Sequence, residues 1–337
     1  MIYLFIAYCI TCLFGCKLFL KTEYDYLSRD VTTSVKGVFI LMVFFSHFNS
    51  YVQYTEWLDR IYTIPFSLIG QGMVTMFLFY SGYGVMEQIK RRDNYVSLMP
   101  VNRILSTLFQ FSVAVVLFAL LRFSLSEPFT VKTFVLSLIG WDSLGNSNWY
   151  IFAVLCMYVI TYISFKIFSG SHKKAALFNL AATTIYIVVM CYIAHKPSQW
   201  YDTVLLYPFG LLWSLYKDKL DKLLKSNVIC ILIFVFALLV WFVIGNFYVK
   251  HIMFALAFLM FTVKVQLGNK ILTWFGKHLF EIYILQRIPM IVLDRLGFLD
   301  AHICISFAIC LCTTIVLAIV FKRYVFKIWN HIILKAV

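Results

Sequence analysis

Long apolar stretches, separated by short polar ones, run through the whole chain. A helix needs roughly 20 apolar residues to cross the ~30 Å hydrocarbon core of a bilayer, and most of these stretches have about that length. The pattern predicts eleven membrane-spanning helices, at residues 2–20, 36–54, 65–86, 103–122, 149–168, 174–194, 203–217, 227–246, 250–267, 272–293 and 302–321. A further apolar stretch, Phe129 to Trp141, is too short to span and is interpreted as a re-entrant or interfacial element.

Composition supports a membrane protein of one domain. Of the 337 residues, 62% are hydrophobic and only 13% are charged, which excludes an ordinary soluble globular protein. No long polar linker interrupts the chain. We therefore expect an all-α, polytopic transmembrane bundle.

The charge distribution predicts the orientation of the bundle. A net charge of +14 is compatible with a nucleic-acid partner, but the basic residues are scattered singly and in pairs between apolar segments. Cytoplasmic loops of membrane proteins are enriched in Lys and Arg. The eleven-span topology places 22 basic residues on one side and 7 on the other. We expect no nucleic-acid partner, an N-terminus outside the cell and a C-terminus in the cytoplasm.

The nine cysteines lie mostly inside apolar stretches, where a thiol packs as a small hydrophobic group. Cys9 and Cys12 have a C-x-x-C spacing, but no His and no second cysteine pair accompanies them. We expect neither a metal site nor a redox site.

Lys36 and His47 are the ionisable residues of the second apolar stretch. Eleven residues of helix correspond to about 16 Å and three turns, so both side chains lie on nearly the same face. An ionisable group inside a membrane helix is costly, and it therefore suggests a functional site. His47 is either a structural residue that is hydrogen-bonded to a neighbouring helix or a general base.

The stretch from Lys36 to His47 resembles the first core helix of the acyltransferase 3 family, whose signature is Arg-x10-His. This family comprises integral-membrane enzymes that acylate sugars, including fucose 4-O-acetylase-like members. Lys36 stands where the family has Arg, which keeps the charge but removes the planar guanidinium fork. The resemblance covers residues 31–325 and implies a ten-helix core. Residues 1–30 then add an N-terminal helix with a cytoplasmic loop, and 326–337 form a cytoplasmic tail.

Two further segments resemble the family at the basic side of the membrane. Met76 to Gly84 is similar to a Phe-rich segment that closes in Ser-Gly-Tyr, and it contains Ser81, which serves either helix packing or substrate binding. The cluster Lys90-Arg91-Arg92, followed by Arg103, is similar to the family's basic loop. It either reflects topology alone or binds the phosphates of coenzyme A.

Asn148, Trp149 and Tyr150 gather at the opposite surface, at the start of the fifth span. Such aromatic residues either anchor a helix at the interface or form a platform for sugar rings. The family has an Asn-Trp-Tyr-like segment here, followed by a Tyr that corresponds to Tyr158. Residues 207–210 similarly resemble its Phe-Pro-x-Gly bend.

Residues 275–286 resemble the family pattern Leu-Gly-Lys-x-Ser-x-x-Ile-Tyr-Leu-x-His. Leu279 replaces the Ser and Gln286 replaces the His. Glu281 is a carboxylate within a membrane helix and should be protonated or paired. Three roles are open for Glu281: a purely structural hydrogen bond, the orientation of a catalytic group, or a place in the lining of the acyl-donor tunnel. Lys277 would contact the donor, and Tyr283 is a candidate to stabilise an oxyanion.

The resemblance implies a membrane O-acyltransferase of the bacterial plasma membrane. Acetyl-coenzyme A or a similar donor enters from the cytoplasm, beside Lys36, Arg91, Arg92, Arg103 and Lys277. His47 removes the proton of a hydroxyl on a cell-surface glycan or its lipid-linked precursor, with direct transfer and no metal. A flippase for lipid-linked oligosaccharides, or another transporter, is the alternative. A third interpretation is an inactive sensor that only binds the acyl donor.

Overall fold

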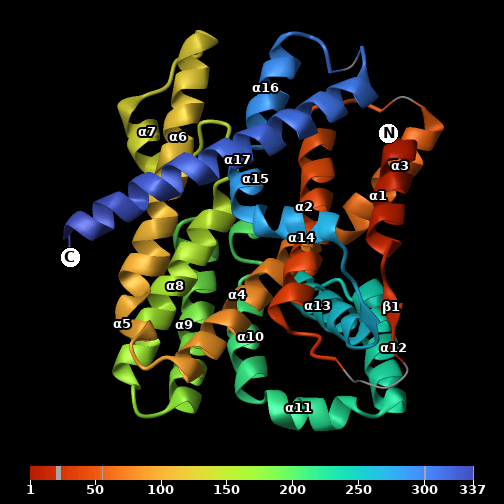
Figure 1. The fold of residues 1–337 in the computed structure, drawn as a ribbon, viewed down its shortest axis with the longest axis vertical. Coiled ribbons are helices and arrows are strands. Elements are labelled where there is room, and N and C mark those ends of the chain that lie inside the picture. Colours follow the sequence, from red (N-terminus) through yellow and green to blue (C-terminus); the bar gives the residue numbers. More distant parts are fainter. Residues whose placement is uncertain (20–23, 55, 300, 337) are drawn as a thin grey trace.

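A computed structural model describes residues 1–19, 24–54, 56–299 and 301–336, and helices make up most of it (Figure 1). Lys21, one of the loop charges counted above, lies outside the described residues. The long helices are α2 (Arg29–Asn49), α4 (Gly72–Arg91), α6 (Ser106–Ser124), α8 (Trp149–Ile167), α9 (His172–Val188), α12 (Asn227–Val243), α13 (Phe247–Lys264) and α17 (Ile303–Ala336).

Shorter elements connect and cover these helices. They are α1 (Ile2–Leu13), α3 (Trp57–Ile69), α5 (Tyr95–Met99), α7 (Val131–Leu138), α10 (Leu206–Leu215), α11 (Lys217–Leu224), α14 (Lys270–Lys277), α15 (Leu279–Leu285) and α16 (Arg287–Arg295). Two π-helices, η1 (Pro100–Leu105) and η2 (Val189–Ile193), and a 3₁₀-helix, η3 (Ser198–Trp200), complete the helical elements. The strands β1 (Lys17–Leu18) and β2 (Val265–Gln266) pair antiparallel, with Lys17 opposite Gln266.

Seven helical stretches of the described chain are long and apolar enough to cross a membrane. They correspond to seven of the eleven predicted spans, so the all-helical, multi-pass architecture is confirmed. The other four predicted spans are shorter or broken. Residues 2–20 contain the 12-residue α1, 203–217 the 10-residue α10, and 227–246 the 17-residue α12, which is bent by 102° from α11. Residues 272–293 are divided among α14, α15 and α16.

Helix α2 begins at Arg29, two turns before the predicted start at residue 36. Ser28 caps it by accepting a hydrogen bond from the backbone N–H of Val31. The polar residues that follow are satisfied inside the fold, since Thr32 donates to the Ser28 carbonyl and the Ser34 hydroxyl bonds that of Thr273 at 2.8 Å. Lys36 consequently lies two turns inside the helix rather than at its first residue.

Glycines allow α14 to cross α2 at backbone contact distance. A Cβ added at Gly37 would collide with the carbonyl oxygen of Leu272, and one added at Gly276 would collide with that of Thr33. Small residues permit such close approach between membrane helices. The crossing fixes the two residues next to these glycines, Lys36 and Lys277, relative to each other.

A second pair of glycines holds α4 against α10. A Cβ at Gly82 would collide with the carbonyl oxygen of Tyr207, and one at Gly210 with that of Phe79. Because Gly82 is held in this contact, the position of the adjacent residue, Ser81, is also fixed.

The bundle has two distinct ends (Figure 1). One end of the bundle is formed by α11, the first residues of α2 and the last residues of α4. We call it the basic end, since Arg29, Arg91 and Arg92 lie there. The end formed by α3, α7 and α16 is the opposite end. Figure 1 places α11 at its lower edge and α16 near its upper edge.

The α4–α10 crossing predicts that Gly82→Ala destabilises the protein by about 1–3 kcal/mol or more, because the added methyl group has no space. Gly84→Ala, on the same helix, is the matched control: no atom lies within 4 Å of its added Cβ. That variant should be unchanged or slightly more stable, since Ala favours a helix over Gly. Thermal unfolding in one detergent measures both. Equal unfolding temperatures for the two variants would contradict this account of the crossing.

Candidate functional site

A cavity of about 960 Å³ enters the bundle from the basic end. Its lining along α4 extends from Arg91 to Phe77, which corresponds to about 21 Å of helix. Eight of the twelve residues predicted for the site line it: Lys36, Ser81, Arg91, Arg92, Arg103, Tyr150, Lys277 and Glu281. These residues come from α2, α4 and the residue that follows it, η1, α8 and the consecutive helices α14 and α15, and so from segments up to about 245 residues apart.

Positive charge predominates in this basic cavity. Its basic lining residues are Arg29, Lys36, Arg91, Arg92, Arg103, Lys277 and Lys322, and its acidic ones are Asp25, Glu87 and Glu281.

The acidic residues are already paired. Glu87 contacts Lys90 at 2.5 Å and Arg91 at 3.4 Å, and Glu281 contacts Lys322 at 3.5 Å. Asp25 pairs with Lys217 outside the lining. Among the described residues, the five basic side chains Arg29, Lys36, Arg92, Arg103 and Lys277 have no acidic partner. A ligand that carries several negative charges would compensate them.

Polar side chains that line the basic cavity contact aromatic rings and hydroxyl groups. The Lys36 ammonium lies 6.0 Å from the centroid of the Tyr80 ring, at the outer range of a cation–π contact. Arg103 belongs to the π-helix η1, and its Nε donates to the Tyr95 hydroxyl at 2.9 Å. The Ser81 hydroxyl bonds that of Tyr158 at 3.0 Å.

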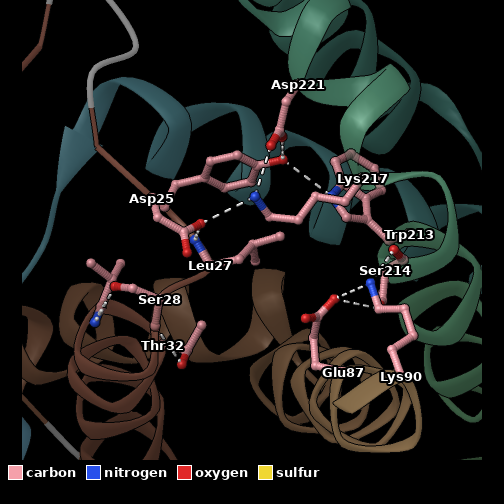
Figure 2. Close-up of polar contacts among 12 residues, drawn as sticks. Asp25, Leu27, Ser28, Thr32, Glu87, Lys90, Trp213, Ser214, Lys217 and Asp221 are labelled. Carbon is pink, nitrogen blue, oxygen red and sulfur yellow. Dashed lines mark hydrogen bonds and ion pairs between the residues drawn. The ribbon is translucent and has the colours of Figure 1, made fainter.

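A network of hydrogen bonds and ion pairs fixes the mouth of the basic cavity (Figure 2). Lys217 lies between Asp221 at 2.7 Å and Asp25 at 3.4 Å, and thereby ties the loop before α2 to α11. The Tyr26 hydroxyl donates to Asp221 at 3.0 Å. Burial and the nearby Asp221 carboxylate raise the pKa of Tyr26, so its hydroxyl stays protonated.

On the other wall of this mouth, Ser214 donates to Glu87 at 2.7 Å (Figure 2). This network could not be identified from the sequence, because its members are separated by up to about two hundred residues in the chain.

His47 lies beyond the deep end of the basic cavity and does not line it. A series of ring contacts connects them: Phe77 to Tyr150 at 6.0 Å, Tyr150 to Tyr283 at 5.2 Å, and Tyr283 to His47 at 6.1 Å between centroids. The Nδ1 atom of His47 and the hydroxyl of Tyr283 are both buried, and neither has a hydrogen-bond partner among the residues that the structure describes. Unsatisfied polar groups are costly, so this pair is suited to meet polar atoms of a ligand.

A second cavity, of about 430 Å³, opens at the opposite end. We call it the outer cavity; its lining residues are Tyr51, Leu121, Arg122, Glu127, Leu144, Gly145, Arg287, Ile291, Asp294 and Arg295. Arg287 interacts electrostatically with both His47 and Tyr283. His47 thus lies between two cavities that enter from opposite ends.

Arg287 was not identified as a site residue from the sequence, where it counted only as a charge of the outer side. The signal was its spacing, since it follows Tyr283 by four residues, and one continuous helix over residues 272–293 would place both side chains on the same face.

Asn148 and Trp149 line neither of these cavities. The Asn148 amide donates to the carbonyls of Gly140 and Asp142, both at 3.0 Å, and so closes the loop before α8. The Trp149 ring is half-buried and lies 6.1 Å from that of Tyr150. Both residues therefore adjoin Tyr150, the residue of this group that reaches the basic cavity.

Within the described parts of the chain, no group of three or more His, Cys, Asp or Glu side chains could hold a metal ion.

The sequence profile of a family described as an acyltransferase domain matches residues 33–323. Comparisons with curated proteins and with solved structures gave no match. The profile covers most of the chain, including the helices that form both cavities and the segments that hold Lys36, His47 and Tyr283. The chain therefore belongs to the acyltransferase 3 family and is a multi-pass membrane acyltransferase.

Proposed function

We propose that this protein transfers an acetyl or similar acyl group from acyl-coenzyme A to a hydroxyl of a cell-surface glycan or its lipid-linked precursor, in the bacterial plasma membrane. The main support is the basic cavity, which carries five basic side chains that have no acidic partner among the described residues. From Tyr150 in its lining, two ring contacts lead through Tyr283 to His47. The excess of basic residues in the loops of this end favours a cytoplasmic location, where acyl-coenzyme A is made.

The donor would occupy the basic cavity with its phosphates toward the mouth. Lys36, Arg91, Arg92, Arg103 and Lys277 would bind these phosphates, because cationic groups form strong, charge-assisted hydrogen bonds to phosphate oxygens. The pantetheine arm would extend along α4 and α8 toward Tyr150. Glu281 is paired with Lys322 in the cavity wall, which supports a role in lining the donor site rather than in proton transfer.

His47 would act as the general base. Its unpartnered Nδ1 would accept the proton of the acceptor hydroxyl while the hydroxyl oxygen attacks the thioester carbonyl carbon. The Tyr283 hydroxyl would donate a hydrogen bond to the oxyanion that forms. When the C–S bond breaks, the proton on His47 would pass to the leaving thiolate, which yields the ester and free coenzyme A. Direct transfer of this kind needs no acyl-enzyme.

Replacement of the base should abolish this reaction. We expect His47→Gln to lower acetyl transfer from acetyl-coenzyme A to surface glycan by about 100-fold or more. His172→Gln, at an exposed position at the start of α9, should retain wild-type activity. Mass spectrometry of ester groups on the glycan measures both variants. Unchanged ester content with His47→Gln would exclude His47 as the base.

The cation deepest in α2 should act on donor binding. We expect Lys36→Gln to raise the KM for acetyl-coenzyme A by about tenfold or more, because a charged contact to phosphate is lost. Lys36→Arg should stay near the wild-type KM, and Lys132→Gln, exposed on α7, should leave it unchanged. Initial rates at varied donor concentration test this. A change in kcat alone would contradict phosphate binding by Lys36.

Access from opposite sides can be tested by labelling in a variant whose native cysteines are replaced by Ala. Ser81→Cys, in the basic cavity, should react with a membrane-impermeant thiol reagent from the cytoplasmic side only. Ile291→Cys, in the outer cavity, should react from the external side only. Thr183→Cys, which is fully buried, is the unreactive control. Labelling of Ser81→Cys and Ile291→Cys from the same side would overturn the two-sided arrangement.

A further inference from the structure

We propose that the outer cavity binds an acidic group of the acceptor, a carboxylate or a phosphate, through Arg287. This inference rests on the proposed function and specifies its acceptor: the hydroxyl that is acylated would belong to an acidic sugar unit. The outer cavity is distinct from the basic cavity that the donor would occupy, and the two share no lining residue.

Within the described chain, the charges of the outer cavity leave Arg287 without an acidic partner. Glu127 is shared by two arginines, because it accepts from Arg122 at 3.1 Å and also contacts Arg295. Asp294 lines the same cavity but forms no ion pair with Arg287 among the described residues. One positive charge therefore remains in excess in the lining.

The Arg287 side chain is built into the cavity wall rather than extended into solvent. Its Nε is buried and has no hydrogen-bond partner in the part of the chain that the structure describes, and its guanidinium lies 5.9 Å from the centroid of the Tyr51 ring. A guanidinium offers a planar fork of N–H donors that matches the oxygens of a carboxylate or a phosphate. A partly desolvated cation without a counter-ion is costly, and an anionic ligand would offset this cost.

Arg287 is placed so that an anion bound to it would lie near His47, the proposed base. Arg287 follows Tyr283 by four residues, and Tyr51, whose ring centroid lies 5.9 Å from the Arg287 guanidinium, follows His47 by four. The Arg287 charge also acts on both His47 and Tyr283, so an anion held by its guanidinium would lie on the outer-cavity side of the proposed base. A hydroxyl on the same sugar or on its neighbour could then reach His47 Nδ1. Asp294, two turns further along α16, could accept hydrogen bonds from other hydroxyls of the acceptor.

The test uses the full-length protein in nanodiscs, radiolabelled acetyl-coenzyme A and three oligosaccharide acceptors that differ in one group. One carries a glucuronic acid unit, one carries glucose in its place, and one carries a glucose phosphate. We expect wild-type protein to prefer a charged acceptor, and Arg287→Gln to lower the ratio of kcat/KM for that acceptor to kcat/KM for the neutral one about 10- to 100-fold. Arg287→Lys should retain part of the preference.

Arg60→Gln, exposed on α3 and outside both cavities, is the matched control and should behave as wild type. Preference for the glucuronic acid acceptor or for the phosphate acceptor would support the proposal and identify which anion is bound. Equal use of all three acceptors by wild-type protein, or an equal loss for all three in Arg287→Gln, would overturn it while leaving the proposed function intact. Transfer to none of them, with no acetyl-coenzyme A consumed, would count against the proposed function itself.

Discussion

Close backbone contact between crossing helices is the constraint on which the site depends. Where α14 crosses α2 and α10 crosses α4, glycine is required because any side chain would overlap a carbonyl oxygen. Both crossings flank the basic cavity. Lys36 and Lys277 are the chain neighbours of the glycines in the first crossing, and Ser81 is the neighbour of Gly82 in the second. Inside a membrane, helices associate through close van der Waals packing rather than through the hydrophobic effect. Here the same packing also positions the polar side chains of the site.

The second constraint is that the bundle separates two cavities while it holds polar groups between them. The Tyr150 and Tyr283 rings close the deep end of the basic cavity, and Arg287 borders the outer one. His47 and Tyr283 retain unsatisfied polar atoms in this wall. Such atoms, like the unpaired cations of the basic cavity, reduce the stability of the empty protein, and a bound ligand can offset that cost.

The sequence was sufficient to predict those features that depend on local pattern. Hydropathy identified the seven full-length spans. The distribution of basic residues among the loops predicted that Arg91, Arg92, Arg103 and Lys277 lie at one end of the bundle, and the structure places them together in the lining of the basic cavity. It could not predict the division of 272–293 into three helices, because this follows from the crossing of α14 over α2. It also missed the early start of α2, where Thr32 and Ser34 are polar but satisfied by hydrogen bonds. Arg287 was missed because its burial results from tertiary packing, and a lone charge near a helix end resembles an ordinary interfacial residue.

The most direct test of the central claim is a cryo-electron microscopy structure of the protein with a non-transferable thioether analogue of acetyl-coenzyme A. The account predicts density in the basic cavity, with the phosphates beside Lys36, Arg92 and Arg103 and the acyl end against Tyr150, toward Tyr283 and His47. The outer cavity should contain no nucleotide. Nucleotide density at the opposite end of the bundle, or an acyl group that points away from His47, would contradict the account.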